Sequence, residues 1–526
     1  MTNPVLALCG VPGLRRGGGM RVLLVNSNRF RHPEPVIPFG LCCVASALEA
    51  AGHTVEVLDL CFSKRPAADI HQAVAVFQPE ALGISIRNID NGVGCNTIFL
   101  LEQVKNEVVL PCRRAFSGPI IVGGSAVGIS APEILDYLDL EWAIRGDGEI
   151  AMPAWLEHLA TGSDPGGIPG LVRRINGTIR ADPVPARVPD LNTLSTVHLG
   201  RYLDLTPYHN LECTIQIQTK RGCPLHCVYC TYNQIEGRRY RLRDPALIAD
   251  DIETLVKETV IHRIEFTDST FNRPLDHAKD VLRALIGKHL DLKLRTMGIT
   301  PGAIDTELFQ LMKEAGFTEI DISVEAGSAA MLRSLGKDFT LDQVLRTAEL
   351  VQSFQIPTMW FMLLGAPGET LKTLRETFDT IDRAISPRDL VVISVGIRIY
   401  KGTPIANYLL ATDPLATPDQ FLHPVSYQPD ALDVATIKQI AAFEQLRRPN
   451  LYLYDDNQEH PFLRRLLCAR REKSGEDEPI WRHLIRGHEV AERLGVRRLR
   501  RALQRRRHPR LWEQWRQSAT AATTGR

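Results

Sequence analysis

The chain has 526 residues, enough for two or three domains, and its 44% hydrophobic and 23% charged content is typical of globular proteins. A formal net charge of +1 gives no global reason to expect nucleic acid or an anionic membrane as a partner. No apolar run is long enough to predict a transmembrane span. The 11 cysteines include a metal-type cluster, which favours a reducing cytoplasm over a disulfide framework.

Residues 1–19 show no periodic pattern, and their short apolar run precedes the basic pair, the wrong order for a secretory signal. We expect a disordered tail there. From residue 20 to about 190, apolar strand patterns alternate with helical ones. Strands are predicted at 21–26, 54–60, 81–86, 119–123 and 142–145, and helices at 40–51, 67–77, 96–109, 131–138 and 149–161. This order predicts a doubly wound, Rossmann-like parallel sheet in an α/β domain.

In such sheets, ligands bind beyond the carboxyl ends of the strands. No G-x-G-x-x-G follows the first strand and no P-loop is present, so a nicotinamide or flavin dinucleotide is not expected. The candidate ligand-binding residues at these strand ends are Arg87, Asn88, Gly123, Gly124, Ser125, Gly146 and Glu149.

Residues 165–189 are rich in proline, glycine and arginine and predict a short hairpin plus linker. Strands and helices alternate again from residue 211 to about 406, within a second domain predicted at 191–425. Strands are predicted at 213–218, 263–267, 293–297, 319–324, 358–364 and 391–399, and helices at 245–258, 275–288, 305–315, 329–335, 341–354 and 371–385. Six βα units predict a partial (βα)6 barrel, with its chemistry at the carboxyl ends of the strands.

Three cysteines follow the first of these strands. Cys223, Cys227 and Cys230 are separated by three and then two residues, and Gly222 and Pro224 favour a tight loop around them. Four cysteines would complete a tetrahedral zinc site or an iron–sulfur ligand set, whereas three leave one metal position open. The alternatives are buried small side chains, or a zinc site assisted by His226.

With Tyr229 just before the last cysteine, this C-x3-C-x2-C loop resembles that of the radical S-adenosylmethionine (SAM) enzymes. The resemblance implies that the cysteines hold a 4Fe-4S cluster whose open iron binds SAM. An electron from the cluster then yields methionine and a 5′-deoxyadenosyl radical.

Three further strand ends fall where this family binds SAM. The resemblance places Asp268 in the methionine-binding loop, where it could accept from the ammonium group. Arg295 could pair with the carboxylate, and Glu325 could accept from the ribose hydroxyls. Each could instead be an ordinary loop or capping residue.

Residues 20–190 resemble the cobalamin-binding domain that precedes many radical SAM domains. The resemblance rests on Ile37-Pro-Phe-Gly-Leu41, the segment 51–59, Gly123-Gly124, Pro132-Glu133 and the segment 144–149. The cobalt-ligating D-x-H-x-x-G is missing: His32 has no such context, and His71 falls inside a predicted helix. Arg87 could lie beneath the corrin ring, since a guanidinium offers no lone pair to cobalt, or it could pair with Asp90.

Residues 426–526 are predicted to be mainly helical and basic, with seven arginines between 497 and 507 and a disordered end from 518. No cofactor motif lies there. A solvated helix face is the plain interpretation of the arginine run, and an acidic partner or RNA is the alternative. Nucleic acid is not expected for the protein as a whole.

By resemblance to cobalamin-dependent radical SAM enzymes, over about residues 20–410, the chain is expected to methylate an unactivated carbon or a phosphorus of a small molecule or natural product. An electron donor such as flavodoxin or ferredoxin would then be required. Two alternatives stay open: oxidative cyclisation or ring rearrangement with the same cofactors, and a cobalamin- or redox-sensing binding protein.

Overall fold

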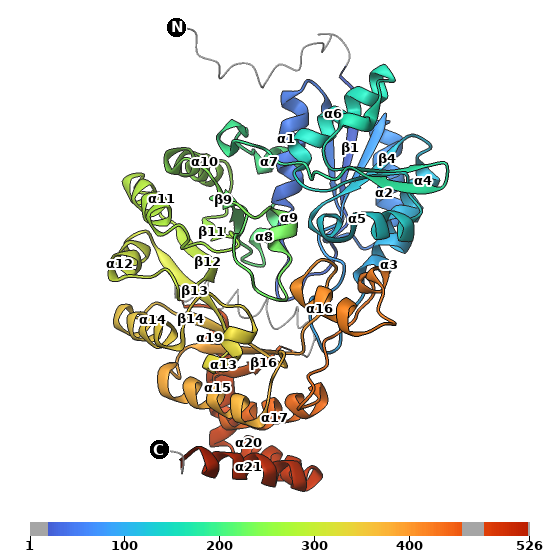
Figure 1. Ribbon diagram of the computed structural model, residues 1–526. Helices are drawn as coiled ribbons and strands as arrows, with labels where there is room; N and C mark the ends of the chain where they lie inside the picture. The colour runs from blue at the N-terminus through green and yellow to red at the C-terminus, as the bar shows by residue number, and fades with distance from the viewer. Residues whose placement is uncertain (1–18, 455–477, 524–526) are drawn as a thin grey trace.

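The computed structural model describes residues 19–454 and 478–523 (Figure 1). The tail predicted at 1–19 therefore lies outside the described residues, apart from Gly19. The described chain forms two seven-stranded sheets, each flanked by helices, and a set of C-terminal helices. No helix in this part of the chain is both long and apolar enough to cross a bilayer.

The first sheet is doubly wound, as predicted. Its strand order is β2-β1-β3-β4-β5-β6-β7, parallel through β5 and closed by the predicted antiparallel hairpin. The strands are β1 (Arg21–Asn26), β2 (Thr54–Asp59), β3 (Ala81–Ser85), β4 (Ile120–Gly123), β5 (Trp142–Ile144), β6 (Leu171–Ile175) and β7 (Thr178–Ala181). Alternate residues of β1 explain the two-sided packing, because Leu23 and Val25 join one apolar core and Val22 and Leu24 join the other.

Helices cover both faces of this sheet (Figure 1). They are α1 (Phe39–Ala50), α2 (Pro66–Phe77), α3 (Leu100–Val104), α4 (Leu110–Ala115), α5 (Ser125–Leu138) and α6 (Gly148–Thr161). A π-helical turn, η2 (Lys105–Val109), joins α3 to α4, so the helix predicted at 96–109 begins later and continues further. In α5, Gly124 precedes the first residue with φ of 101°, which starts the helix directly after β4.

The second sheet is the predicted partial barrel with one more strand. Its order is β16-β15-β14-β13-β12-β11-β8, all parallel, and the two outer strands do not pair. The strands are β8 (Ile215–Ile217), β11 (Arg263–Phe266), β12 (Lys293–Ile299), β13 (Phe317–Glu325), β14 (Thr358–Leu364), β15 (Leu390–Val395) and β16 (Leu451–Leu453). Because β16 belongs to this sheet, a domain boundary between residues 425 and 426 would divide the barrel.

The barrel helices lie on the outer face of the curved sheet (Figure 1). They are α10 (Pro245–Glu258), α11 (Leu275–Gly287), α12 (Thr306–Glu314), α13 (Ala329–Ser334), α14 (Leu341–Phe354), α15 (Leu371–Ala384) and α17 (Val434–Arg447). Shorter elements fill the connections: α7 (Leu199–Tyr202), α8 (Thr206–His209), α9 (Tyr232–Ile235), α16 (Pro404–Thr412), η3 (Pro165–Gly167), η4 (Leu191–Thr193), η5 (Pro418–Leu422), and the ribbon of β9 (Lys220–Arg221) with β10 (Arg241–Leu242).

Three C-terminal helices pack on the barrel: α19 (Trp481–Arg493), α20 (Val496–Arg507) and α21 (Pro509–Thr523). The arginine run is helical as predicted, but it is not only a solvated face. Arg497 is buried and donates to the Arg448 carbonyl at 3.1 Å, and Arg501 donates to the Leu446 carbonyl at 3.0 Å, which satisfies the end of α17. The disorder predicted from residue 518 is wrong up to Thr523, where α21 ends.

Candidate functional site

The loop that carries the three cysteines leaves β8 and β9 at the carboxyl end of the barrel. Gly222 makes this turn possible, because its φ is 101° and a β-carbon there would lie 2.0 Å from the Arg239 carbonyl oxygen. The Cys223 amide donates to the Gly237 carbonyl at 2.9 Å, so the loop is held from both sides. The sequence therefore places the cysteines on a rigid turn.

The three thiols are free and largely hidden from solvent. Burial raises the pKa of each of them, and that of Cys230 reaches about 12. The Cys227 and Cys230 thiols lie close enough to Cys223 and to each other for their charges to interact. Within the described residues, no three such ligands are grouped closely enough to hold a single metal ion. Neighbouring thiols that do not share one ion suit a cubane cluster, in which each thiolate binds a different iron.

A buried trio lies beside these thiols. Tyr229 donates to the Glu325 Oε1 atom at 2.7 Å, and Lys337 Nζ lies 3.0 Å from the Tyr229 hydroxyl and 3.2 Å from Glu325 Oε1. The Lys337 ammonium also lowers the pKa of Cys227 and Cys230, against the larger effect of burial. A cation in this position favours the thiolate form that iron requires.

Glu325 ends β13 with φ of 69°, in the left-handed region that a residue with a side chain rarely adopts. Its first carboxylate oxygen is already taken by Tyr229 and Lys337. Contact between Glu325 and the SAM ribose stays a prediction.

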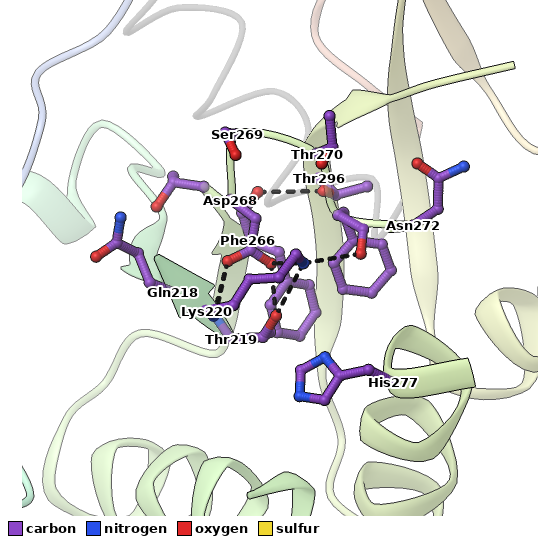
Figure 2. Close-up of polar contacts among 12 residues, drawn as sticks. Gln218, Thr219, Lys220, Phe266, Asp268, Ser269, Thr270, Asn272, His277 and Thr296 are labelled. Carbon is purple, nitrogen blue, oxygen red and sulfur yellow. Dashed lines mark hydrogen bonds and ion pairs between the residues drawn. The ribbon is translucent and has the colours of Figure 1, made fainter. Parts of the chain in front are cut away.

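Asp268 has a different place from the one expected. Its carboxylate is fully buried and accepts from the Thr219 amide at 2.8 Å, the Thr219 hydroxyl at 2.7 Å and the Lys220 amide at 3.2 Å (Figure 2). The Lys220 ammonium completes the set, 3.2 Å from the same carboxylate and 3.0 Å from the Phe271 carbonyl. This side chain ties the loop after β11 to the strand before the cysteines, and its hydrogen-bonding capacity is spent there.

Arg295 also differs from its predicted role as a free carboxylate binder. It forms ion pairs with Glu34, with Glu265 at 3.0 Å and with Glu319 at 3.4 Å. Three carboxylates of the protein already occupy this guanidinium, so it has little capacity left for the carboxylate of SAM.

The cobalamin-domain candidates divide into two groups. Arg87 and Asn88 line a small surface hollow at the carboxyl ends of β1 and β3. A β-carbon at Gly124 would lie 2.5 Å from the Ile86 carbonyl oxygen, and the Ser125 hydroxyl donates to the Arg87 carbonyl at 2.6 Å. The Gly123-Gly124 turn therefore packs against the strand end that carries Arg87.

The second group faces the barrel instead. Glu149 accepts from Arg221 at 2.6 Å, just before the cysteines, and Arg221 also lies 3.5 Å from Asp147. A β-carbon at Gly146 would lie 2.2 Å from the Ala186 carbonyl oxygen, so this glycine permits the linker to pass. Gly146 and Glu149 thus join the first domain to the cysteine loop.

Arg87 does not pair with Asp90. The Asp90 carboxylate accepts from Arg398 at 2.8 Å and from Tyr400 at 2.6 Å, which locks the first domain to the barrel. The Arg87 guanidinium forms no salt bridge with any described residue. The Arg87 side chain lines the hollow and is exposed there, while Tyr232 and Glu265 of the barrel lie near its guanidinium. Burial among these groups lowers the pKa of Arg87.

The two histidines considered as cobalt ligands lie in different places, and His32 is the nearer to Arg87, because its stacking partner Tyr454 lies close to that guanidinium. His71 is exposed on α2, as expected for a solvated helix residue. The His32 ring stacks on Tyr454, with the ring centroids 5.7 Å apart.

Comparisons with known proteins match both halves of this arrangement. A family model described as a B12 binding domain matches residues 32–156, and the radical SAM superfamily model matches residues 217–381. The chain is a cobalamin-dependent radical SAM enzyme. Its cofactors are a 4Fe-4S cluster, SAM and cobalamin, and the three neighbouring thiols are suited to the cluster.

Individual relatives of this radical SAM enzyme include methyltransferases and cyclases. It is 27% identical to the tryptophan 2-C-methyltransferase of Streptomyces laurentii, over 73% of either chain. It is 24% identical to the anaerobic magnesium-protoporphyrin IX monomethyl ester cyclase of Rubrivivax gelatinosus, over 68% of this chain and 65% of the cyclase. The solved structure of the methyltransferase TsrM from Kitasatospora setae, with cobalamin and a 4Fe-4S cluster bound, shares its fold. That match has a TM-score of 0.78 at 23% identity and covers 91% of this chain and 99% of TsrM.

Sequence reasoning missed three sets of contacts around the candidate site: those of Lys220, those of Lys337 and the Asp90–Arg398 pair. Lys220 stands three residues before the first cysteine, so its place in the cluster loop was visible in the sequence. The Lys337–Tyr229 contact joins residues 108 positions apart, and the Arg398–Asp90 contact joins residues 308 positions apart. No local sequence pattern predicts contacts at such separations.

Proposed function

We propose that this enzyme transfers a methyl group to an unactivated carbon, or to a phosphorus, of a small organic substrate. One observation supports this most directly. Arg87 of the first domain lies close enough to Tyr232, just after the last cysteine, and to Glu265, inside the barrel, for its charge to interact with both. The cobalamin edge and the cluster loop thus face a common space, as transfer from one cofactor to a substrate activated by the other requires.

The chain's own residues would act as follows. Cys223, Cys227 and Cys230 would hold the cluster, with the Lys337 ammonium balancing part of the thiolate charge. Arg87 would lie at the cobalamin edge without offering cobalt a lone pair. When bound, the cluster and SAM supply radical chemistry and cobalamin carries the methyl group; the protein orients these groups and excludes water.

The substrate class and the electron donor belong to this proposal. A small molecule is supported by Tyr232, which stays 42% exposed although it lies close to Arg87 of the first domain and to Glu265 of the barrel. A low-potential donor such as flavodoxin or ferredoxin would reduce the cluster. A reducing cytoplasm suits both the donor and the free cysteines of the described chain.

The test is anaerobic reconstitution with iron, sulfide and cobalamin, followed by incubation with SAM, a reductant and a cell extract of small molecules. A product heavier by about 14 Da, with its added carbon labelled from methyl-labelled SAM, supports methyl transfer. A product without added mass supports the cyclase alternative. Cys227→Ala should abolish SAM consumption, and the exposed His71→Ala serves as the control. SAM consumption that persists in Cys227→Ala would contradict the cluster assignment, and no SAM consumption by the parent enzyme would leave only a sensing role.

A further inference from the structure

The interior face of the barrel carries a polar row that SAM, cobalamin and the cluster do not account for. Gln216 on β8, Glu265 on β11, Arg295 on β12 and Glu319 on β13 are direct neighbours in the strand register. Residues of the opposite parity, such as Ile264, Leu294 and Ile320, are buried under the helices. Side chains alternate between the two faces of a strand, so the four polar residues point into the barrel.

Carboxylates dominate this row. Arg295 is in contact with Glu265 and Glu319 from its own sheet and with Glu34 from the loop that follows β1. Asp321 lies two residues beyond Glu319 on the same face of β13. Four carboxylates therefore surround one guanidinium, and we call Glu34, Glu265, Glu319 and Asp321 the acidic row.

Several acceptor atoms of this region are buried without a partner. Asp321 is 6% exposed and makes no hydrogen bond or ion pair with any described residue. The Oε1 atoms of Glu265 and Gln216 are fully buried and have no donor. Burial, followed by repulsion from Glu319, raises the pKa of Asp321 well above its ordinary value. Unsatisfied buried acceptors are costly, and a ligand that brings donors and positive charge would remove that cost.

A metal ion does not fit, because no group of three or more ligating side chains among the described residues converges on one point. We assign SAM to the other end of β13, since the edge that meets the cysteine loop is at Glu325, four residues along the strand from Asp321. At about 3.3 Å per residue that separation is about 13 Å. The nearby walls are aromatic: Tyr232, Tyr454 and Trp481, whose indole donates to Glu319 at 2.8 Å.

We propose that the substrate carries a protonated amine on an aromatic or apolar body, and that Asp321 and Glu265 bind this amine. The inference rests on the proposed function, because it assigns the substrate of that same site. The ammonium donates to the unpartnered carboxylate oxygens and to Gln216, and it offsets the excess negative charge around Arg295.

The experiment measures binding to the reconstituted holoenzyme by anaerobic calorimetry with three matched probes: 2-phenylethylamine, 2-phenylethanol and 3-phenylpropionate. The amine is expected to bind at least about tenfold more tightly than the alcohol, and the carboxylate more weakly still. Asp321→Asn should weaken amine binding about tenfold and leave the alcohol within about twofold. Asp342→Asn, at an exposed acid that begins α14, is the matched control and should change neither.

Equal affinity for amine and alcohol, or no binding of the amine, overturns the inference, and this comparison needs only the parent enzyme. An Asp321→Asn variant that loses SAM affinity but keeps amine affinity also overturns it, because the acidic row would then serve SAM. Methyl transfer to a neutral or anionic substrate would refute the inference while the proposed function stands. Amine binding without methyl transfer would refute the proposed function while the inference about the amine stands.

Discussion

Asp268 offers a sharp test, because the sequence and the structure assign it different roles. The Lys220 and Asp268 side chains are 1% and 0% exposed, and their ion pair joins β9, just before the cysteines, to the loop after β11 (Figure 2). Lys220→Met removes the cation. The Asp268 carboxylate then keeps three hydrogen bonds, from the Thr219 amide, the Thr219 hydroxyl and the amide of residue 220. Asp268→Asn removes the anion and leaves a buried ammonium.

Removing one partner of a buried ion pair typically costs about 3–5 kcal/mol, because the other charge stays buried and uncompensated. The rich hydrogen bonding of Asp268 places Lys220→Met near the lower figure, about 3 kcal/mol, and Asp268→Asn near the same value. Against a typical total stability of about 5–15 kcal/mol, either loss is readily measured. The exposed Lys257–Glu253 pair on α10 is the control, and Lys257→Met should cost about 0.5 kcal/mol or less.

The assay is urea unfolding followed by circular dichroism, together with equilibrium dialysis of SAM on the reconstituted variants. The structure predicts a large stability loss in both variants, and a double variant whose loss is smaller than the sum of the two. An Asp268→Asn enzyme of parental stability that has lost SAM affinity more than tenfold would refute the anchoring argument. It would restore Asp268 as a direct contact to the SAM ammonium.

Three further predictions follow from other parts of the chain. Arg87→His should place an imidazole at the cobalamin edge, add nitrogen splitting to the paramagnetic resonance spectrum of cob(II)alamin and slow methyl transfer about tenfold. Arg87→Ala should not add the splitting. Unchanged spectra and turnover in both variants would show that Arg87 has only a structural role. Trp515→Ala should cost about 3–5 kcal/mol in unfolding free energy, because the ring is 1% exposed and its Nε1 donates to Glu444 at 2.6 Å, while cobalamin and iron per folded protein stay unchanged. Burial raises the pKa of Asp389 to about 6, so the folded state binds its proton more tightly than the unfolded chain and stability falls as the pH rises from about 4 to above 6. Asp389→Asn should therefore match the parent near pH 4 and exceed it by up to about 3 kcal/mol at pH 8, and a constant difference across this range would contradict the assignment.

Much of the fold was accessible from local patterns. The helices at 245–258 and 341–354 match α10 and α14 to the residue, and β1 and β14 were placed with equal accuracy. Apolar periodicity records which face of an element is buried, and Asp244 and Thr340 supply the caps that begin those two helices. The edge strand β16 was missed because three residues, Leu451–Leu453, are too short to show a period.

The candidate site also has a part that local sequence predicts and a part that it does not. The spacing of Cys223, Cys227 and Cys230 and the turn at Gly222 identify the cluster loop, because ligands for one cluster come from a single tight segment. The roles of Asp268 and Arg295 could not be derived from their positions at strand ends, because a charged residue there can face a ligand or another charged residue. Their partners, Lys220 and Glu34, were chosen by the packing of loops from other parts of the chain.

The sequence by itself determined the two cofactor domains and the alternation of strands and helices along them, and it predicts the cluster ligands, because each depends on residues within about one element of one another. Only the tertiary structure decided which charged side chains pair with other residues of the protein and which can still bind a ligand. Asp268 and Arg295 are committed to protein partners, whereas Arg87 forms no salt bridge with the described residues and Asp321 no hydrogen bond or ion pair with them. That distinction depends on distances between segments far apart in the chain, since a buried charge is stabilised only by what packs against it.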